Sequence, residues 1–132
     1  MDVVYYYDEK SSSCPVREYL NQYSKDTKLI IDIRQRIKVV KERDGRPTPP
    51  LTKPLRGYSF YEFRHRYSAK NALIRILYFC YKDKIVLLNV FEKPDHYETN
   101  FVRKKIKKHY DITETYFQKF LSNPKLYEEY KE

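Results

Sequence analysis

The stretch KPLRGYSFYEFRHRYSAKNALIRILYFCYKDKIVLLNVFEK, residues 53–93, decides the fold of this chain. It contains three runs rich in aromatic and branched apolar residues, and the short polar segments SAKNA and KDK separate them. Runs of this composition between polar turns are typical of β-strands, and turns this short join neighbouring antiparallel strands. The stretch therefore predicts a three-stranded antiparallel meander.

Arginines interrupt the apolar pattern of the first two runs. Side chains alternate between the faces of a strand, so Arg64 and Arg66 share one face while His65 points to the other. If the first hairpin closes within SAKNA, Arg75 of the second run lies opposite or diagonal to Arg64. Like charges at such positions repel each other, so we expect an anion to lie between them. We expect Glu62 to pair with an arginine on its own face.

Two helices are predicted between an initial strand at residues 3–7 and the meander. A serine-rich turn followed by Pro15 favours the start of the first helix, and the second is expected to end near Arg43. Both are amphipathic, so they predict a helical hairpin that packs on the sheet. The proline-rich segment DGRPTPPLTKP then predicts an extended loop. The apolar positions at helical spacing are Val16, Tyr19, Leu20, Tyr23, Ile30, Ile33, Ile37 and Val40.

The chain after the meander is predicted to be helical. Residues 101–110 combine five cations with apolar positions at Phe101, Val102, Ile106 and Tyr110, which predicts a basic amphipathic helix. Residues 111–132 predict a C-terminal extension of one or two further helical turns. Its apolar patch is expected to consist of Phe117, Phe120 and Leu121. The whole chain is thus expected to be one α+β domain with its core in about residues 3–110.

Composition and charge restrict the classes of function. The 132 residues are 41% hydrophobic and 34% charged, which is typical of one globular domain. The formal net charge of +9 favours a polyanionic partner, because each cation placed on a phosphate releases a condensed counterion. Gly45 and Gly57 are the two glycines, so neither a P-loop nor a dinucleotide-binding fingerprint is present.

The cysteines and the apolar runs bear on compartment and cofactors. Cys14 and Cys80 form no CxxC motif and no histidine pair has metal-ligand spacing, so we expect neither a metal nor another cofactor. Cys80 is expected in the core, and a single disulfide stays possible from sequence alone. The longest apolar runs, such as IVLLNVF, are too short to span a membrane, and MDVVYYYDEK is not a signal peptide. We expect a reduced, cytoplasmic protein without a membrane partner.

Four motifs in order resemble the RelE/ParE superfamily of bacterial toxins, and in particular its HigB-type, phage-associated branch. They are Lys53-Pro54-Leu55, Tyr61-Glu62-Phe63-Arg64, Arg75-Ile76-Leu77-Tyr78 and Leu87-Leu88-Asn89-Val90-Phe91-Glu92-Lys93. The resemblance covers about residues 3–110 and implies a RelE-like fold with the order β-α-α-β-β-β-α. The chain departs from the family at Asn89, where histidine is frequent, and at EKPDHYETN, which replaces KKTQKTP.

The resemblance also implies an activity and partners. A toxin of this branch is a ribosome-dependent endoribonuclease that cleaves mRNA without a metal and inhibits translation. Its partners are then the 70S ribosome, mRNA and a cognate antitoxin, expected to be a small helix-turn-helix protein. Two alternatives stay open: a ParE-type toxin that binds DNA gyrase, and a non-catalytic RNA-binding phage accessory protein.

Metal-free RNA cleavage requires a group that takes the proton of the 2′-hydroxyl, cations for the phosphorane charge and an acid for the leaving oxygen. Guanidinium groups hold two phosphate oxygens at once, which suits Arg64, Arg66 and Arg75. For proton transfer we rank His96 and Tyr97 above His65, which faces away from the arginines. Lys93 would need a pKa depressed by its cationic neighbours. The predicted RNA-binding residues are Lys53, Arg56, Lys70, Arg103, Lys104 and Lys107.

Overall fold

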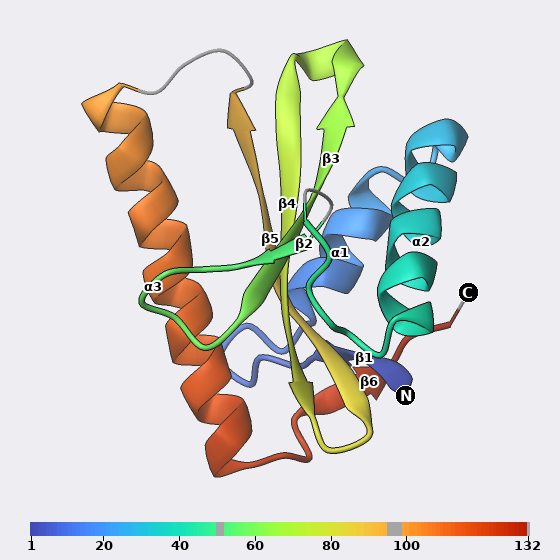
Figure 1. Ribbon diagram of the computed structural model, residues 1–132, viewed down its shortest axis with the longest axis vertical. Helices are drawn as coiled ribbons and strands as arrows, with labels where there is room; N and C mark the ends of the chain where they lie inside the picture. Colours follow the sequence, from blue (N-terminus) through green and yellow to red (C-terminus); the bar gives the residue numbers. More distant parts are fainter. Residues whose placement is uncertain (50–51, 95–98, 132) are drawn as a thin grey trace.

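The computed structural model describes residues 1–49, 52–94 and 99–131. Within these ranges the chain is an α+β domain with a six-stranded mixed sheet and three α-helices (Figure 1). A 3₁₀ turn at Ser68–Lys70 closes the first hairpin. The elements in chain order are β1 (Asp2–Tyr6), α1 (Pro15–Gln22), α2 (Thr27–Glu42), β2 (Thr52–Pro54), β3 (Tyr61–Tyr67), β4 (Ala72–Tyr81), β5 (Lys84–Pro94), α3 (Asn100–Ser122) and β6 (Tyr127–Glu129).

The predicted meander forms the centre of the sheet. The strand order is β2-β3-β4-β5-β1-β6, and β3, β4 and β5 are antiparallel neighbours. β1 runs parallel to β5, so the connection through α1 and α2 passes over one face of the sheet. The loop expected between α2 and the meander contains the three-residue edge strand β2, where Pro54 is tolerated at the outer edge.

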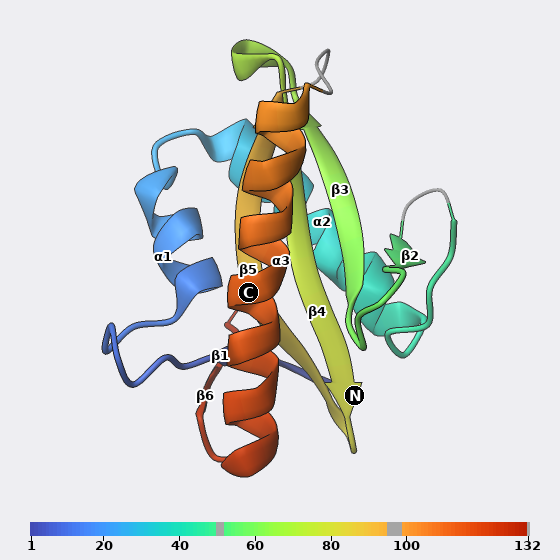
Figure 2. The same cartoon turned by 90° about the vertical axis from the view of Figure 1, so that its left-hand side faces the viewer.

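The helices cover both faces of the sheet. α1 and α2 pack on one face and α3 lies along the other, as the two perpendicular views show (Figures 1 and 2). The core under α1 and α2 includes Ile33, Ile37 and Tyr78, in agreement with the predicted helical hairpin. The start of α2 is capped by Asp26, whose carboxylate accepts a hydrogen bond from the Leu29 amide at 3.2 Å. No helix in the described ranges has the length and apolar character needed to cross a membrane.

The C-terminal residues differ from the predicted extension. One continuous helix, α3, joins the basic segment to the following turns, and its second half contributes Phe117 and Phe120 to the core. β6 then pairs antiparallel with β1 and completes the sheet. The expected apolar roles of Phe101 and Leu121 are wrong, since 67% and 42% of these side chains are exposed. Residues beyond 110 therefore belong to the packed domain.

The two cysteines are both free. Cys14 is buried at the start of α1, whereas Cys80 is exposed, so the expectation that Cys80 belongs to the core is wrong. The reason is its position at the end of β4, beyond the last turn of α2. Here Gly45, in the left-handed region at φ 73°, lies against the Cys80 sulfur where a Cβ atom would collide with it.

Candidate functional site

A β-bulge in β5 determines which side chains face α3. Leu77 of β4 pairs with Asn89, but the next residue of β4, Tyr78, pairs with Leu87, so β5 has one extra residue here. Asn89 accordingly turns toward α3 and donates a hydrogen bond to the Thr113 hydroxyl at 3.1 Å. Phe91 and Lys93 continue on the same face.

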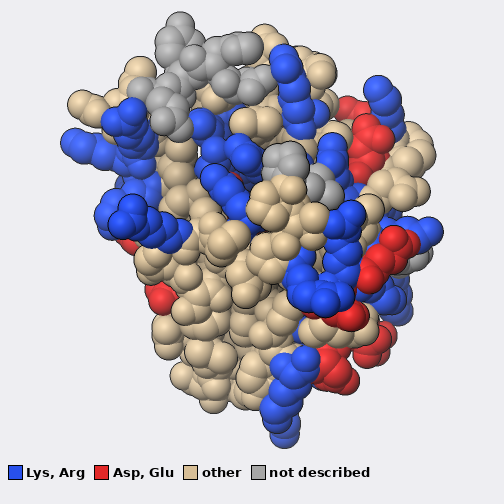
Figure 3. Space-filling view, in the orientation of Figure 1, with Lys and Arg blue, Asp and Glu red and all other residues tan. Residues whose placement is uncertain are grey.

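Four cations gather on this face of the sheet. Arg64 and Arg75 are direct cross-strand partners, as the sequence predicted, and Arg75 in turn pairs with Phe91. The next row consists of Arg66, Leu73 and Lys93. Figure 3 shows Lys and Arg side chains in and around a hollow in the upper part of the molecule, between α3 and the sheet. We call Arg64, Arg66, Arg75 and Lys93 the cationic face.

Arg75 is held in place by a buried polar network. Its Nη1 atom lies 3.7 Å from Glu62 Oε1 and donates a hydrogen bond to the Tyr110 hydroxyl at 3.0 Å. The Tyr110 hydroxyl donates in turn to Glu62 Oε2 at 3.0 Å, and Lys53 Nζ lies 3.6 Å from Glu62 Oε1. Glu62 is fully buried, and its ion pair with Arg75 confirms the prediction that it pairs with an arginine of its own face.

The network fixes the state of Tyr110. Burial and the neighbouring Glu62 carboxylate raise the pKa of Tyr110 to about 12, although Arg75 opposes them. The hydroxyl therefore stays protonated at neutral pH and acts as a hydrogen-bond donor to Glu62. Glu62 is shared between Arg75 and Lys53, so it offsets only part of the Arg75 charge, while its contact and the Tyr110 hydrogen bond fix the orientation of the guanidinium.

Arg64 has different surroundings, although it lies directly beside Arg75. Its side chain is half-buried. Among residues 1–49, 52–94 and 99–131, no carboxylate or hydrogen-bonding group contacts it. Two cations at paired positions destabilise a sheet unless an anion lies between them. Arg64 is thus the member of the cationic face best placed to bind an added phosphate. Arg66 is exposed beside it, while Lys93 is buried with 8% of its surface accessible.

The predicted RNA-binding residues do not form one surface. Lys53 contacts Glu62 beneath the cationic face, and Arg56 is exposed after β2. Lys70 lies on the other side of the sheet, where it contacts the Tyr23 hydroxyl and lies 3.7 Å from Glu92 Oε2. The remaining three are exposed on α3: Arg103, Lys104 and Lys107, of which Lys107 forms an ion pair with Asp111 at 3.0 Å.

The histidine and tyrosine candidates for proton transfer named from the sequence divide into two groups, and Lys93 lies in the cationic face. His65 faces α2, with Nε2 at 3.9 Å from Asp32 Oδ2, which confirms that it points away from the arginines. Burial lowers the pKa of His65, Arg36 adds to this effect, and Asp32 opposes it. His96 and Tyr97 lie outside the described residues.

Sequence reasoning missed His109 of α3. Its ring stacks on Phe91 with a centroid distance of 4.5 Å and an angle of 4° between the planes. The contact depends on the bulge in β5, which turns Phe91 toward α3 and which no sequence pattern predicted. A signal was nevertheless present, since His109 lies three residues after Ile106 and four before Thr113, on the stripe of α3 that faces the sheet.

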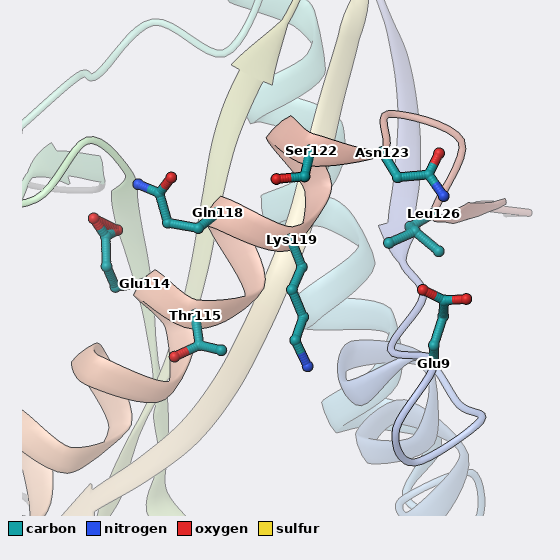
Figure 4. Close-up of a pocket in the computed structure, with 8 residues that line it drawn as sticks. All are labelled: Glu9, Glu114, Thr115, Gln118, Lys119, Ser122, Asn123 and Leu126. Atoms are coloured by element: carbon teal, nitrogen blue, oxygen red, sulfur yellow. The ribbon is translucent and has the colours of Figure 1, made fainter.

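The pocket in Figure 4 lies away from the cationic face. It is an open cavity of about 530 Å³ between the end of α3 and the turn after β1. Glu9 and Glu114 line it, and Lys119, its single cation, lies 3.7 Å from the buried carboxylate of Asp8. This lining does not suit a polyanion.

The function of this site is indicated neither by a group of metal ligands among the described residues nor by similarity to a known protein. Within the part of the chain that the structure describes, no group of three histidine, cysteine, aspartate or glutamate residues could hold a metal ion. Comparisons with protein-family models, with curated proteins and with solved structures find no match. The function must therefore be inferred from the geometry of the cationic face.

Proposed function

We propose that this protein is the toxin of a toxin–antitoxin system, with a RelE-like fold, that cleaves mRNA on the ribosome as a metal-independent endoribonuclease. The observation that carries the proposal is the pairing of Arg64 and Arg75 on one face of the sheet, with Arg64 lacking an anionic partner among the described residues. A phosphate between the two guanidinium groups removes their mutual repulsion.

Cleavage at a phosphate requires donors that stabilise the developing charge and a cation that holds the phosphate, and the two arginines can supply both. Arg75 is pre-oriented by Glu62 and Tyr110, and donors fixed before the reaction stabilise developing charge without reorganisation. Arg64 supplies a guanidinium that can hold two phosphate oxygens at once. The two groups together favour the doubly charged phosphorane over the singly charged phosphodiester.

The exposure of the cationic face and of α3 bears on how a substrate approaches. α3 packs closely on the sheet through Phe117 and Phe120, but it diverges from the sheet toward its N-terminal end (Figure 1). Phe101 in the first turn of α3 is 67% exposed. Arg64 is half-buried and Arg66 is exposed, so an RNA strand reaches the cationic face first at these two residues.

The order of the elements is compatible with the proposed family. Two helices separate β1 from the meander and one helix follows it, as the resemblance of the sequence motifs implies. The proposal includes a cytoplasmic toxin whose partners are the ribosome, mRNA and a cognate antitoxin with a helix-turn-helix domain.

The test is to induce the full chain in bacteria, map mRNA 5′ ends across the transcriptome and measure gyrase supercoiling activity in extracts of the same cells. We expect new 5′-hydroxyl ends at a fixed position within codons of translated messages and unchanged supercoiling. Intact transcripts with inhibited supercoiling would contradict the proposal and favour a gyrase-binding toxin. Intact transcripts with normal growth would contradict it in favour of a non-catalytic protein.

A further inference from the structure

His109 and Tyr110 bring α3 directly over the cationic face. The His109 ring stacks on Phe91, and the Tyr110 ring meets the same Phe91 edge-on at 5.7 Å and 79°. Phe91, Arg75 and Arg64 are cross-strand partners in one row. His109 therefore stacks on the residue at one end of this row, and Arg64 is at the other end, about 10 Å from Phe91 along the sheet by two strand spacings.

The His109 ring is fixed in orientation, and the described residues leave its nitrogens without hydrogen bonds. The parallel stack on Phe91 and the neighbouring contact of Tyr110 with Arg75 limit rotation of this turn of α3. In the described ranges, neither ring nitrogen of His109 has a hydrogen-bond partner, and the side chain is half-buried. A base that is held by stacking and has an available nitrogen is ready to accept a proton.

The surroundings of His109 favour its neutral form. Burial lowers the pKa of His109, and Lys105, one helical turn earlier, lowers it further. On the sheet, Arg75 and Lys93 lie on the face toward α3, and the Glu62 carboxylate is already shared by Arg75, Lys53 and Tyr110. Neutral imidazole is the form that a general base requires at physiological pH.

We propose that His109 is the catalytic base of this site, a role that rests on the proposed function. With the scissile phosphate between Arg64 and Arg75, His109 takes the proton from the adjacent 2′-hydroxyl. The 2′-oxygen forms a bond to phosphorus as the bond from phosphorus to the 5′-oxygen breaks. The 5′-oxygen takes a proton from water, and the imidazolium returns its proton to solvent. The products are a 2′,3′-cyclic phosphate and a 5′-hydroxyl end.

The first test compares the wild-type chain with His109→Phe in a reconstituted translation reaction, with the cleavage rate of one reporter mRNA as the readout. Phenylalanine keeps the stack on Phe91 and removes both nitrogens, so the fold is retained. We expect the rate to fall roughly 100- to 10,000-fold, which is the usual contribution of a general base. His65→Gln, on the opposite face of the sheet, is the matched control and leaves the rate unchanged.

The second test uses the pH profile and keeps His109 in place. Lys105→Met removes the cation that lowers the pKa of His109, so the acidic limb of the cleavage profile moves to higher pH. A purely structural role for His109 does not produce this shift.

Two results overturn the inference while leaving the proposed function intact. One is a wild-type chain that cleaves mRNA together with a folded His109→Phe that cleaves at the same rate. The other is a combination of two observations: His96→Gln loses cleavage, and the acidic limb of the pH profile of cleavage is the same in Lys105→Met as in the wild type. A wild-type chain that does not cleave mRNA overturns both proposals, and circular dichroism spectra of each variant exclude unfolding as the cause of lost activity.

Discussion

Arg64 and Arg75 are neighbours on the sheet, yet their side chains have different physical roles. Arg75 is 6% exposed and neutralises the fully buried Glu62, whereas Arg64 is half-buried with no anionic partner in the described ranges. Removal of one partner of a buried ion pair leaves the other charge buried without compensation, which lowers the free energy of unfolding. Removal of a partially exposed cation such as Arg64 leaves no such charge. We therefore expect loss of Arg64 to affect the proposed activity without affecting stability.

The first prediction concerns the stability supplied by Arg75. We expect Arg75→Ala to lower the free energy of unfolding by about 3 kcal/mol, the lower end for a broken buried pair, because Lys53 still contacts Glu62. The measurement is urea denaturation. As a control, the double substitution Glu62→Leu with Arg75→Leu removes both charges and recovers most of the loss. Equal stability of Arg75→Ala and the wild type would show that the ion pair has no structural role.

The second prediction concerns the Tyr110 hydroxyl. Tyr110→Phe removes the donor to Glu62 and the acceptor for Arg75 without changing the packing against Phe91. We expect a loss of about 1–3 kcal/mol in the free energy of unfolding, since a buried carboxylate oxygen loses its hydrogen bond. Tyr58→Phe, whose hydroxyl contacts Asp111 near the surface, is the control with a smaller effect. Equal effects of the two substitutions would contradict the buried network.

The third prediction is a dependence of stability on pH through His65. Its pKa in the folded state is lowered below the ordinary 6.5, so the unfolded chain binds the proton more readily. The stabilising contribution is complete above the ordinary pKa and decreases as the pH falls below it. We expect the free energy of unfolding to fall between about pH 7 and pH 5.5 and the slope to be smaller in His65→Gln. A slope that His65→Gln leaves unchanged contradicts this account.

At the scale of elements, the strands of the meander and the helices before it were predictable from local pattern. Alternation in residues 58–67 placed Arg64 and His65 on opposite faces, and helical spacing identified Ile33 and Ile37 as buried. These features depend on the period of each element and hardly on its neighbours.

The parts that could not be predicted depend on contacts between distant elements. The bulge at Asn89 shifts Phe91 and Lys93 to the face of α3, and no local pattern encodes it. The pairing of β6 with β1 was missed because three residues give too short a pattern. The stack of His109 on Phe91 and the hydrogen bond from Tyr110 to Glu62 depend on these contacts, so neither was predicted. The pairing of Glu62 with an arginine of its own face needed only strand alternation, and it was predicted.

The fourth prediction tests whether the second half of α3 belongs to the core. Phe120 is fully buried, whereas Phe101 at the other end of the same helix is 67% exposed. We expect Phe120→Ala to lower the free energy of unfolding by about 3–5 kcal/mol and Phe101→Ala to change it by about 0.5 kcal/mol or less. Thermal and urea unfolding of both variants provide the comparison. If Phe120→Ala left the free energy of unfolding unchanged, the residues after 110 would be an extension that the fold does not need.

At the scale of the whole molecule, the positive charge is distributed unevenly. Lys and Arg side chains gather in the upper part of the view in Figure 3, whereas the lower left of the same face has few. In the proposed function, the net charge of +9 attracts RNA to the molecule as a whole, and the cationic face then positions one phosphate. Long-range attraction and local geometry thus act on the same substrate at different distances.

The most direct measurement is primer extension on a single reporter mRNA in a reconstituted translation reaction that contains the wild-type chain, Arg64→Ala or Arg36→Ala. Arg36 lies on α2, on the opposite side of the sheet, and matches the loss of charge. We expect the wild type and Arg36→Ala to cleave the mRNA at similar rates. The cleavage rate of a folded Arg64→Ala should be roughly 100- to 1,000-fold lower, which is the usual effect of losing one donor to the transition state. Equal cleavage by Arg64→Ala and Arg36→Ala, or no cleavage by the wild type, would contradict the claim that the cationic face binds the scissile phosphate.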